Sequence, residues 1–309
     1  MKGKEDKMKY AVIDIGSNSI KLRVYKTEND KINILFSNRI TAGLAYHIED
    51  NIMTNEGIIK AAEVLNEYIE LIKNFSVDKY YIYATASIRN IKNTTEVIDE
   101  IFRLTECKID VLSAEEEAML GFKGIMEDID ITDGLMIDIG GGSSEVVSFI
   151  NSKNKENISF PIGSLNLYKK FVRDFLPTKE ERKKISEKIS EEINNKSSLD
   201  FEKYKDFKNI CIIGGTAYSL LKLINDHFDL NKDNIIIEVN KFKELKELLS
   251  NDYNKAKELI IKSCPDRVHT IIPGILILDT IINKTYAENI IVSDYGLSEG
   301  YLLRKIEEV

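Results

Sequence analysis

The sequence is poor in the residues that build disulfide frameworks, metal clusters and cysteine- or histidine-dependent active sites. It contains three histidines and three cysteines, and the cysteines (Cys107, Cys211 and Cys264) lie far apart. An odd number of scattered cysteines without a C-x-x-C pair argues against a disulfide framework and against a zinc site. No apolar run reaches the length of a membrane span, and residues 1–10 lack the apolar core of a signal peptide. We therefore expect a cytoplasmic globular protein that does not bind a membrane.

The sequence also lacks an excess of positive charge and several common nucleotide and hydrolase motifs. Its 51 Asp and Glu residues outnumber its 43 Lys and Arg residues, which gives a formal net charge of −8. This balance argues against a nucleic-acid partner, although a local site on an acidic protein can still bind a phosphorylated ligand. The chain has no Walker A sequence, no strand–G-x-G-x-x-G–helix segment and no G-x-S-x-G motif.

The sequence does contain a regular alternation of short apolar strands and amphipathic helices. With 309 residues and 43% hydrophobic content it can bury large cores, and its length predicts two domains. From the apolar periodicity we expect strands at residues 9–17, 20–26, 31–39, 79–87, 108–112, 134–140, 144–150, 156–163, 209–215 and 289–294. We expect helices at residues 58–75, 94–104, 113–125, 177–193, 216–226, 273–282 and 296–306, and more than one helix within residues 241–262. This alternation predicts an α/β fold.

An internal repeat is the strongest organisational feature. Aligning Asp14 with Asp138 also aligns the isoleucine, glycine and serine that follow, together with the strands on both sides. Two copies of one unit predict two similar domains around a shared cleft. We place the first domain at residues 1–128 and the second at 129–295, and we expect the last helix, 296–309, to pack back on the first domain.

The two repeated turns, "VIDIGSNSIKL" and "MIDIGGGSSEVV", have the composition of anion-binding loops. Glycine lets backbone N–H groups approach a ligand, and successive N–H groups form a concavity that holds an anion. The aspartates before the turns, Asp14 and Asp138, supply oxygen ligands suited to Mg²⁺. The alternative interpretation is an ordinary pair of tight hairpin turns. The candidate phosphate-binding residues of these turns are Ser17, Asn18, Ser19, Gly140, Gly141, Gly142 and Ser143.

A third glycine turn and one arginine are further candidates for phosphate binding. The turn "IGGTA" with Gly215 leads into a helix, so it could present a helix N-terminus to an anion or could be a plain strand-to-helix turn. Arg89 follows a strand and offers a fork of donors that matches phosphate, although a lone arginine is more often a surface residue. Arg267 is equally ambiguous, and His269 has no neighbours that would make it catalytic.

Three adjacent glutamates in "SAEEEAML" have different expected roles. Ser113 and Glu116 fit a capping box, and Glu115 suits the first helical turn. Glu117 is left without either of these roles. It lies at the junction of the two repeats, where its carboxylate could orient and deprotonate a water molecule. A solvated acidic helix start is the alternative interpretation. A second capping box is predicted at Thr178 and Glu181.

Glu145 lies in the otherwise apolar segment "SEVVSF". In the repeat register it falls at the position of Lys21. An acid directly after a glycine turn is a candidate ligand for a metal or a water, and its alternative is an outward-facing polar residue of an alternating strand.

The sequence resembles the exopolyphosphatase/guanosine pentaphosphate phosphohydrolase (Ppx/GppA) family, within the superfamily of acetate kinases, sugar kinases, heat-shock chaperones and actin. The resemblance runs through "AVIDIGSNSIKL", "ATASIRNIKN", "VLSAEEEAMLGFKGI", "MIDIGGGSSEVV", "FPIGSLNLYKKF", "IIGGTAYSL", "RVHTIIPGILIL" and "VSDYGLSEGYLL". It implies two ribonuclease-H-like (actin-like ATPase) domains, each a mixed sheet with flanking helices. It also implies Mg²⁺-dependent hydrolysis of a terminal phosphoanhydride bond.

The resemblance also implies roles for individual residues. Glu117 matches the family's catalytic acid or base and Arg89 its phosphate-contacting arginine. The loop residues match at Asp138, Gly140, Ser143 and Glu145, and the first loop matches at Asp14 and Ser17 to Ser19. Two departures are Ser298 and Asn166, which stand where many members carry arginine. The chain looks like the short form of the family, without the helical HD-type domain of longer members.

The substrate expected from this resemblance is inorganic polyphosphate, with guanosine pentaphosphate as the alternative. The protein could also be a sensor that binds guanosine penta- or tetraphosphate without hydrolysis, or a kinase that transfers phosphate from ATP to a metabolite. A filament-forming protein is the least favoured interpretation. Related proteins often dimerise, so a homodimer is a further expectation.

Overall fold

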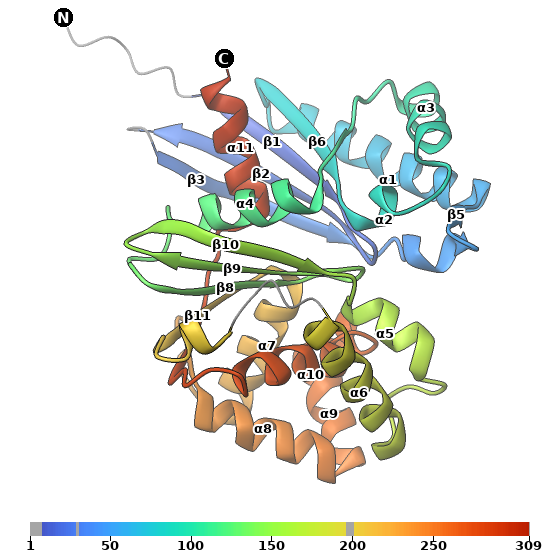
Figure 1. The fold of residues 1–309 in the computed structure, drawn as a ribbon. Coiled ribbons are helices and arrows are strands. Elements are labelled where there is room, and N and C mark those ends of the chain that lie inside the picture. Colours follow the sequence, from blue (N-terminus) through green and yellow to red (C-terminus); the bar gives the residue numbers. More distant parts are fainter. Residues whose placement is uncertain (1–7, 29–30, 196–200, 309) are drawn as a thin grey trace, which may run out of the picture. The chain divides into compact units, whose positions relative to one another are not determined.

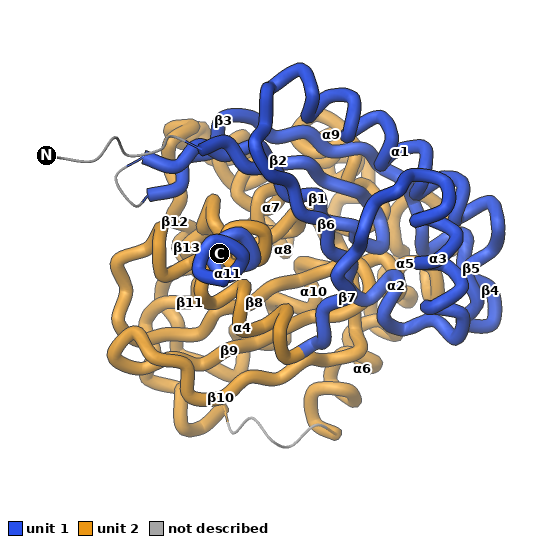
Figure 2. Tube along the Cα trace, turned by 90° about the horizontal axis from the view of Figure 1, so that it is seen from above, with its two compact units in different colours: residues 1–114, 301–309 blue, residues 115–300 orange. Residues whose placement is uncertain are grey.

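The computed structural model describes residues 8–28, 31–195 and 201–308 and divides the chain into two compact units (Figures 1 and 2). Unit 1 contains residues 1–114 and 301–309, and unit 2 contains residues 115–300. The sequence placed the first boundary at 128/129, whereas the contacts group residues 115–128 with the second unit. The signal-peptide expectation concerns residues 1–10, of which 1–7 lie outside the described residues. None of the helices in the described part of the chain is long and apolar enough to span a bilayer.

Unit 1 is built on a five-stranded sheet with the order β3-β2-β1-β6-β7. Its strands are β1 (Lys9–Ile15), β2 (Ile20–Glu28), β3 (Lys31–Ile40), β6 (Lys79–Ala84) and β7 (Asp110–Val111), and a small hairpin is formed by β4 (Ile48–Glu49) and β5 (Ile52–Met53). The first three strands are antiparallel, while β1, β6 and β7 are parallel. The helices are α1 (Asn55–Asn74), α2 (Ala86–Arg89) and α3 (Thr94–Thr105). The apolar faces of α1 and α3 cover this sheet.

Unit 2 repeats this order as β10-β9-β8-β11-β13 and adds the antiparallel edge strand β12. Its strands are β8 (Gly134–Ile139), β9 (Ser144–Ile150), β10 (Lys153–Phe160), β11 (Asn209–Ile213), β12 (Ile236–Glu238) and β13 (Asn289–Val292). Its helices are α4 (Ala114–Ile125), α5 (Ser164–Phe171), α6 (Lys179–Asn195), α7 (Gly214–His227), α8 (Val239–Asn251), α9 (Tyr253–Ser263) and α10 (Ile271–Ile282). The chain passes from unit 2 to unit 1 within α11 (Leu297–Glu307).

Both faces of the central strands of unit 2 are covered. Leu135 and Ile137 of β8 face a large core with α6, α7, α8 and α10. Met136 of β8 and Val147 of β9 face the opposite side, where they pack with Phe122 of α4. Because neighbouring residues of a strand point to opposite faces, α4 lies over the even-numbered side chains of β8 and the odd-numbered side chains of β9.

The register confirms the predicted repeat. Asp14 is paired with Lys21 across β1 and β2, and Asp138 is paired with Glu145 across β8 and β9. The glycine turns close in the same way, because the N–H of Gly16 donates to Ser19 O at 3.1 Å and the N–H of Gly140 donates to Ser143 O at 3.0 Å.

Element boundaries differ from the prediction where single residues interrupt a pattern. The expected strand 156–163 ends at Phe160, because the following Pro161 has no N–H for the ladder. The helices expected within residues 241–262 are α8 and α9, which meet at Asp252, whose carboxylate accepts the N–H of Lys255 at 2.9 Å as an N-cap. The expected strand 108–112 pairs only at Asp110–Val111.

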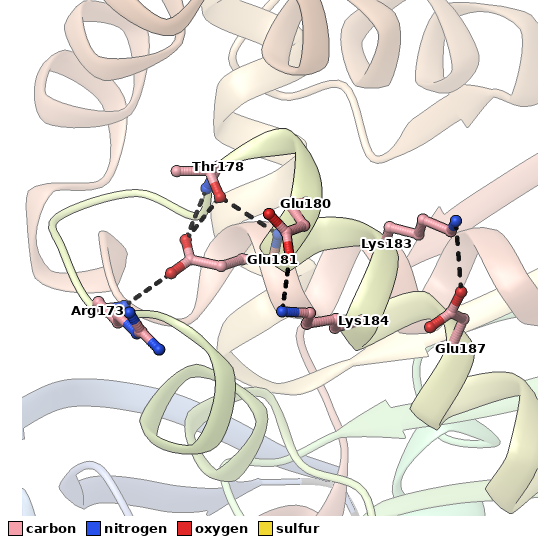
Figure 3. Close-up of polar contacts among 7 residues, drawn as sticks. All are labelled: Arg173, Thr178, Glu180, Glu181, Lys183, Lys184 and Glu187. Atoms are coloured by element: carbon pink, nitrogen blue, oxygen red, sulfur yellow. Dashed lines mark hydrogen bonds and ion pairs between the residues drawn. The ribbon is translucent and has the colours of Figure 1, made fainter.

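The predicted capping box at the start of α6 is present (Figure 3). The N–H of Glu181 donates to Thr178 Oγ1 at 3.3 Å, and the N–H of Thr178 donates to Glu181 Oε2 at 2.9 Å. Reciprocal bonds of this kind satisfy two backbone donors that the first helical turn leaves open.

Candidate active site

The candidate site of unit 2 lies where β8, β9 and β10 run side by side at the glycine turn. Asp138, Glu145 and Ser159 are direct neighbours across these three strands. Asp138 and Glu145 have the same parity as Met136 and Val147, so their side chains lie on the face that α4 covers. β8 runs parallel to β11, so Asp138 lies at the carboxyl edge of these two strands, which is where open α/β sheets bind ligands.

Glu117 reaches this group from α4. It is 7% exposed, whereas Glu115 of the same helical turn is exposed to solvent. The interpretation of Glu117 as part of a solvated acidic helix start is therefore wrong for this residue. The neighbouring Ala118 packs into the core between α4 and the sheet, which holds the first turn of the helix against the sheet.

Glu145 is 1% exposed and is the most unusual group of the site. Burial raises the pKa of its carboxyl well above the ordinary value, and the charges of Glu117 and Asp138 raise it further. The hydroxyls of Ser159 and Ser143 oppose this rise. Ser159 Oγ donates to Glu145 Oε1 at 2.8 Å, while Oε2 has no hydrogen-bond partner in the described part of the chain. The buried Oε2 of Glu145 therefore has no positively charged partner among the described residues. Because Glu145 is buried, its interpretation as an outward-facing strand residue is wrong.

The glycine turn of unit 2 is held by the N-terminus of α5. The N–H of Ser164 donates to Gly140 O at 2.9 Å, and the N–H of Leu165 donates to Gly141 O at 3.1 Å. The amide of Asn166 donates to Gly142 O at 3.4 Å. With the carbonyls directed to α5, the N–H groups of Gly141 and Gly142 donate to no other residue that the structure describes. These two N–H groups fit an anion.

The third glycine turn contacts the same aspartate. Gly214 has φ +84°, and a Cβ there would lie 2.6 Å from Asp138 Oδ1. The guanidinium of Arg267 packs so closely on Gly215 that a Cβ on this glycine would overlap it. Thr216 Oγ1 donates to Ile139 O at 3.0 Å and fixes the start of α7 beside the end of β8. The sequence-predicted Gly215 thus lies in the neighbourhood of Asp138.

The glycine turn of unit 1 has equivalent supports. The N–H of Gly43 donates to Asn18 O at 2.8 Å, and the N–H of Ala45 donates to Ser17 O at 2.9 Å. Ser87 Oγ donates to Ile15 O at 3.1 Å, as Thr216 does to Ile139 in unit 2. Because the structure describes each unit by itself, the binding of one ligand by both turns stays a prediction. The role of Ser19 in binding phosphate stays a prediction as well.

The charges of the two turns differ. Lys21 Nζ lies 3.2 Å from Asp14 Oδ2, so the aspartate of unit 1 is already paired with a cation. In unit 2 the position of Lys21 is taken by Glu145. Of the two turns, the carboxylates of unit 2 are therefore the stronger candidates for a metal. Arg89, the predicted phosphate ligand of unit 1, donates from Nη1 to Leu112 O at 2.9 Å.

The carboxylates of unit 2 fit a partial magnesium site. Among the described residues, no group of three or more His, Cys, Asp or Glu side chains is placed to hold a metal ion by itself. Mg²⁺ commonly takes one or two carboxylates and completes its shell with water and substrate phosphates. Asp138 and the unpartnered oxygen of Glu145 match this pattern.

Two supporting residues, Ser159 and Ser164, were missed by reasoning from the sequence. Ser159 acts on Glu145 only because β10 is in register with β9. Ser164 fixes the glycine turn through its N–H and its Oγ, which donates to Gly140 O at 3.0 Å. The "PIGS" segment gave one signal, since Gly163 must approach the turn closely; a Cβ there would lie 2.2 Å from Gly141 O.

Comparison with known proteins gives a consistent result. A sequence model described as the Ppx/GppA phosphatase family matches residues 23–309. A bifunctional 3-dehydroquinate synthase/phosphatase of Fusobacterium nucleatum is 29% identical over 96% of the chain, which spans only 46% of that protein. A putative exopolyphosphatase of Haemophilus influenzae is 24% identical, and the alignment covers 94% of the chain and 90% of that protein.

The fold also agrees with a solved structure. The exopolyphosphatase of Cytophaga hutchinsonii superposes with a TM-score of 0.87 at 21% identity, covering 98% of the chain and 99% of that protein. The expected fold class is confirmed by this match: two mixed sheets with flanking helices, of the actin-like ATPase type.

Proposed function

Because the chain belongs to the Ppx/GppA phosphatase family of hydrolases, we propose that it is an exopolyphosphatase that releases orthophosphate from the end of inorganic polyphosphate. The observation that carries this proposal is the group Glu117, Asp138 and Glu145 beside a glycine turn in which the N–H groups of Gly141 and Gly142 donate to no other described residue. A relative described as a putative exopolyphosphatase supports the choice of substrate.

The glycine turn would bind the terminal phosphate. The N–H groups of Gly141 and Gly142 supply donors for its oxygens, and Ser143 adds a hydroxyl. The bonds from α5 to the carbonyls fix the turn before the ligand arrives, so little reorganisation is needed on binding.

Asp138 and Glu145 would hold Mg²⁺. When bound, the ion neutralises charge on the phosphoryl group and supplies the positive charge that the buried Glu145 lacks. Asp14 remains a candidate ligand for Mg²⁺, although its carboxylate is paired with Lys21.

Glu117 would orient a water molecule for in-line attack and accept its proton. The bond from the water oxygen to the terminal phosphorus forms, the bridging P–O bond breaks, and the shortened chain leaves with its electron pair. Phosphoryl transfer depends on positioning and charge stabilisation, so no nucleophilic side chain is required. Burial raises the pKa of Cys211 and of Cys264 to about 12, which keeps both thiols protonated at neutral pH.

A substrate comparison tests this function. The wild-type protein with Mg²⁺ is given polyphosphate, guanosine pentaphosphate, or ATP with candidate acceptors, and free orthophosphate is measured. We expect the highest kcat/KM with polyphosphate and no need for an acceptor. A higher kcat/KM with guanosine pentaphosphate would show that this nucleotide, and not polyphosphate, is the substrate. Tight nucleotide binding without phosphate release would indicate a sensor. Phosphate transfer from ATP that depends on an acceptor would indicate a kinase.

Ser159 provides a prediction about the carboxylate next to it. Ser159→Ala removes the donor to Glu145 Oε1, and we expect about a tenfold fall in kcat/KM and a higher Mg²⁺ concentration for half-maximal rate. Ser159→Thr keeps the hydroxyl and should restore most of the rate. Ser148→Ala is the matched control, because Ser148 is a buried serine of β9 that bonds to Glu156 instead. Equal Mg²⁺ requirements for Ser159→Ala and wild type would contradict the role of Ser159.

A further inference from the structure

Unit 2 contains a cavity of about 660 Å³ between the start of α8, the end of α10 and the start of β13. The cavity lies at the sheet edge opposite to the glycine turn. Its lining residue Asn289 is the β-sheet partner of Asn209, the first residue of β11, whereas Asp138 is the partner of Ile213, the last residue of β11. The cavity is therefore separate from the candidate active site, and its volume is typical of small-molecule sites.

The walls of the cavity are fixed by buried side chains and backbone bonds. The buried residues that line it are Val239, Ile282 and Ala287. The N–H of Val239 donates to Glu288 O at 2.9 Å, which joins the start of α8 to the start of β13. The N–H of Tyr286 donates to Lys205 O at 2.9 Å. Because these bonds form the cavity without a ligand, little ordering is needed on binding.

Four polar side chains that line the cavity form no hydrogen bond or ion pair with another residue that the structure describes. They are Asn240 and Lys243 of α8, Asn283 at the end of α10, and Tyr286. Asn240 and Lys243 are three residues apart, so they lie on one side of the helix. Tyr286 is 71% exposed, which leaves its ring open for stacking by a planar ligand.

The charges of the cavity limit the ligand that it fits. The carboxylate of Glu238 is paired with Lys241 at 2.9 Å, and the carboxylate of Glu288 is paired with Lys208. Lys243 is thus the one charged lining residue without an ion-pair partner in the described part of the chain. One cation beside two carboxylates disfavours a polyanion, whereas carboxylate oxygens accept hydrogen bonds from sugar hydroxyls. The cavity fits a ligand with a planar ring, hydroxyls and a single phosphate.

We propose that this cavity binds a purine nucleoside monophosphate. The base would stack on Tyr286, and the amides of Asn240 and Asn283 would bond to its polar edge. Lys243 would pair with the phosphate, and the two carboxylates would accept the ribose hydroxyls. A two-ring base is favoured over a single ring because it buries more apolar area against the tyrosine. The inference does not depend on the proposed function, because the cavity shares no residue with the candidate active site.

The first experiment measures binding to the wild-type protein by titration calorimetry in EDTA. We expect AMP and GMP to bind, and we expect adenosine and ribose 5-phosphate each to bind at least about tenfold more weakly than AMP, because each lacks one of the proposed contacts. Absence of binding by both AMP and GMP would overturn the inference. Equal affinities for AMP and ribose 5-phosphate would overturn it as well, because the base would then make no contact.

Variants then locate the bound nucleotide. Tyr286→Ala and Lys243→Ala should each weaken AMP binding about tenfold, whereas Tyr286→Phe and Lys243→Arg should stay within about threefold of wild type. The matched controls are Tyr253→Ala and Lys262→Ala of α9, which should leave the affinity unchanged. All four side chains are exposed, so these variants should fold as wild type does. Unchanged binding by Tyr286→Ala, or an equal loss in the controls, would overturn the inference.

Competition separates this cavity from the glycine turn. In the Glu117→Gln variant with Mg²⁺, an excess of tripolyphosphate should not displace bound AMP. Displacement would place the nucleotide at the glycine turn and would overturn the inference.

Discussion

Replacing Glu117 by glutamine should reduce phosphate release by a factor of about 10² to 10⁴, which is the contribution of a general base. Glutamine has the same shape but cannot accept the proton of the attacking water. Because Glu117 is buried against the sheet beside Glu145, the loss of its charge also relieves repulsion, and the variant should be folded and at least as stable as wild type. Orthophosphate release and the melting temperature are measured on the same preparation.

The control for this experiment is Glu115→Gln. Glu115 lies in the same helical turn but is exposed, so its replacement should leave the turnover within about twofold of wild type. Near-normal turnover in Glu117→Gln, or an equal loss in Glu115→Gln, would remove Glu117 from the role of general base.

Replacing Glu145 by glutamine should have two opposite effects. Phosphate release should fall at least about 10²-fold, because the variant loses a charge that the proposed site uses for Mg²⁺. The melting temperature of the metal-free protein should rise, because a buried carboxylate with two like-charged neighbours is removed. Loss of function with gain of stability is the pattern expected of a strained functional group.

The destabilising effect of the Glu145 charge should also appear in the pH dependence of the melting temperature. The pKa of Glu145 is raised in the folded protein, so its contribution to stability is fully present below the ordinary carboxyl pKa and is lost as the pH rises through the raised value. In EDTA, the melting temperature of wild type should therefore fall with rising pH in this window more than that of Glu145→Gln. Parallel melting curves for the two proteins across this window would contradict the environment described for Glu145.

Much of this site could be predicted from the sequence, because its position depends on local patterns. The glycine turns, the strands beside them and the equivalence of Lys21 and Glu145 follow from the repeat, and the register confirms them. The capping box assigns Glu116 and the helix dipole assigns Glu115, which leaves Glu117, and the exposure of Glu115 and the burial of Glu117 agree with this.

The rest depends on contacts between segments that are distant in the sequence. The bond from Ser159 to Glu145 requires the register of β10, and the anchoring of the glycine turn requires α5 to dock its N-terminus there. The ion pair between Lys21 and Asp14 shows that equivalent positions of a repeat can carry different charges and therefore different chemistry.

The most direct test of the account follows the oxygen atom of the attacking water. Polyphosphate is hydrolysed by the wild-type protein in water labelled with heavy oxygen, and orthophosphate and the shortened chain are analysed by mass spectrometry after a single turnover. The account predicts that the label enters the released orthophosphate and that Glu117→Gln gives almost no product. Label in the shortened chain, or phosphate release that is independent of Glu117, would contradict water attack on the terminal phosphate at this site.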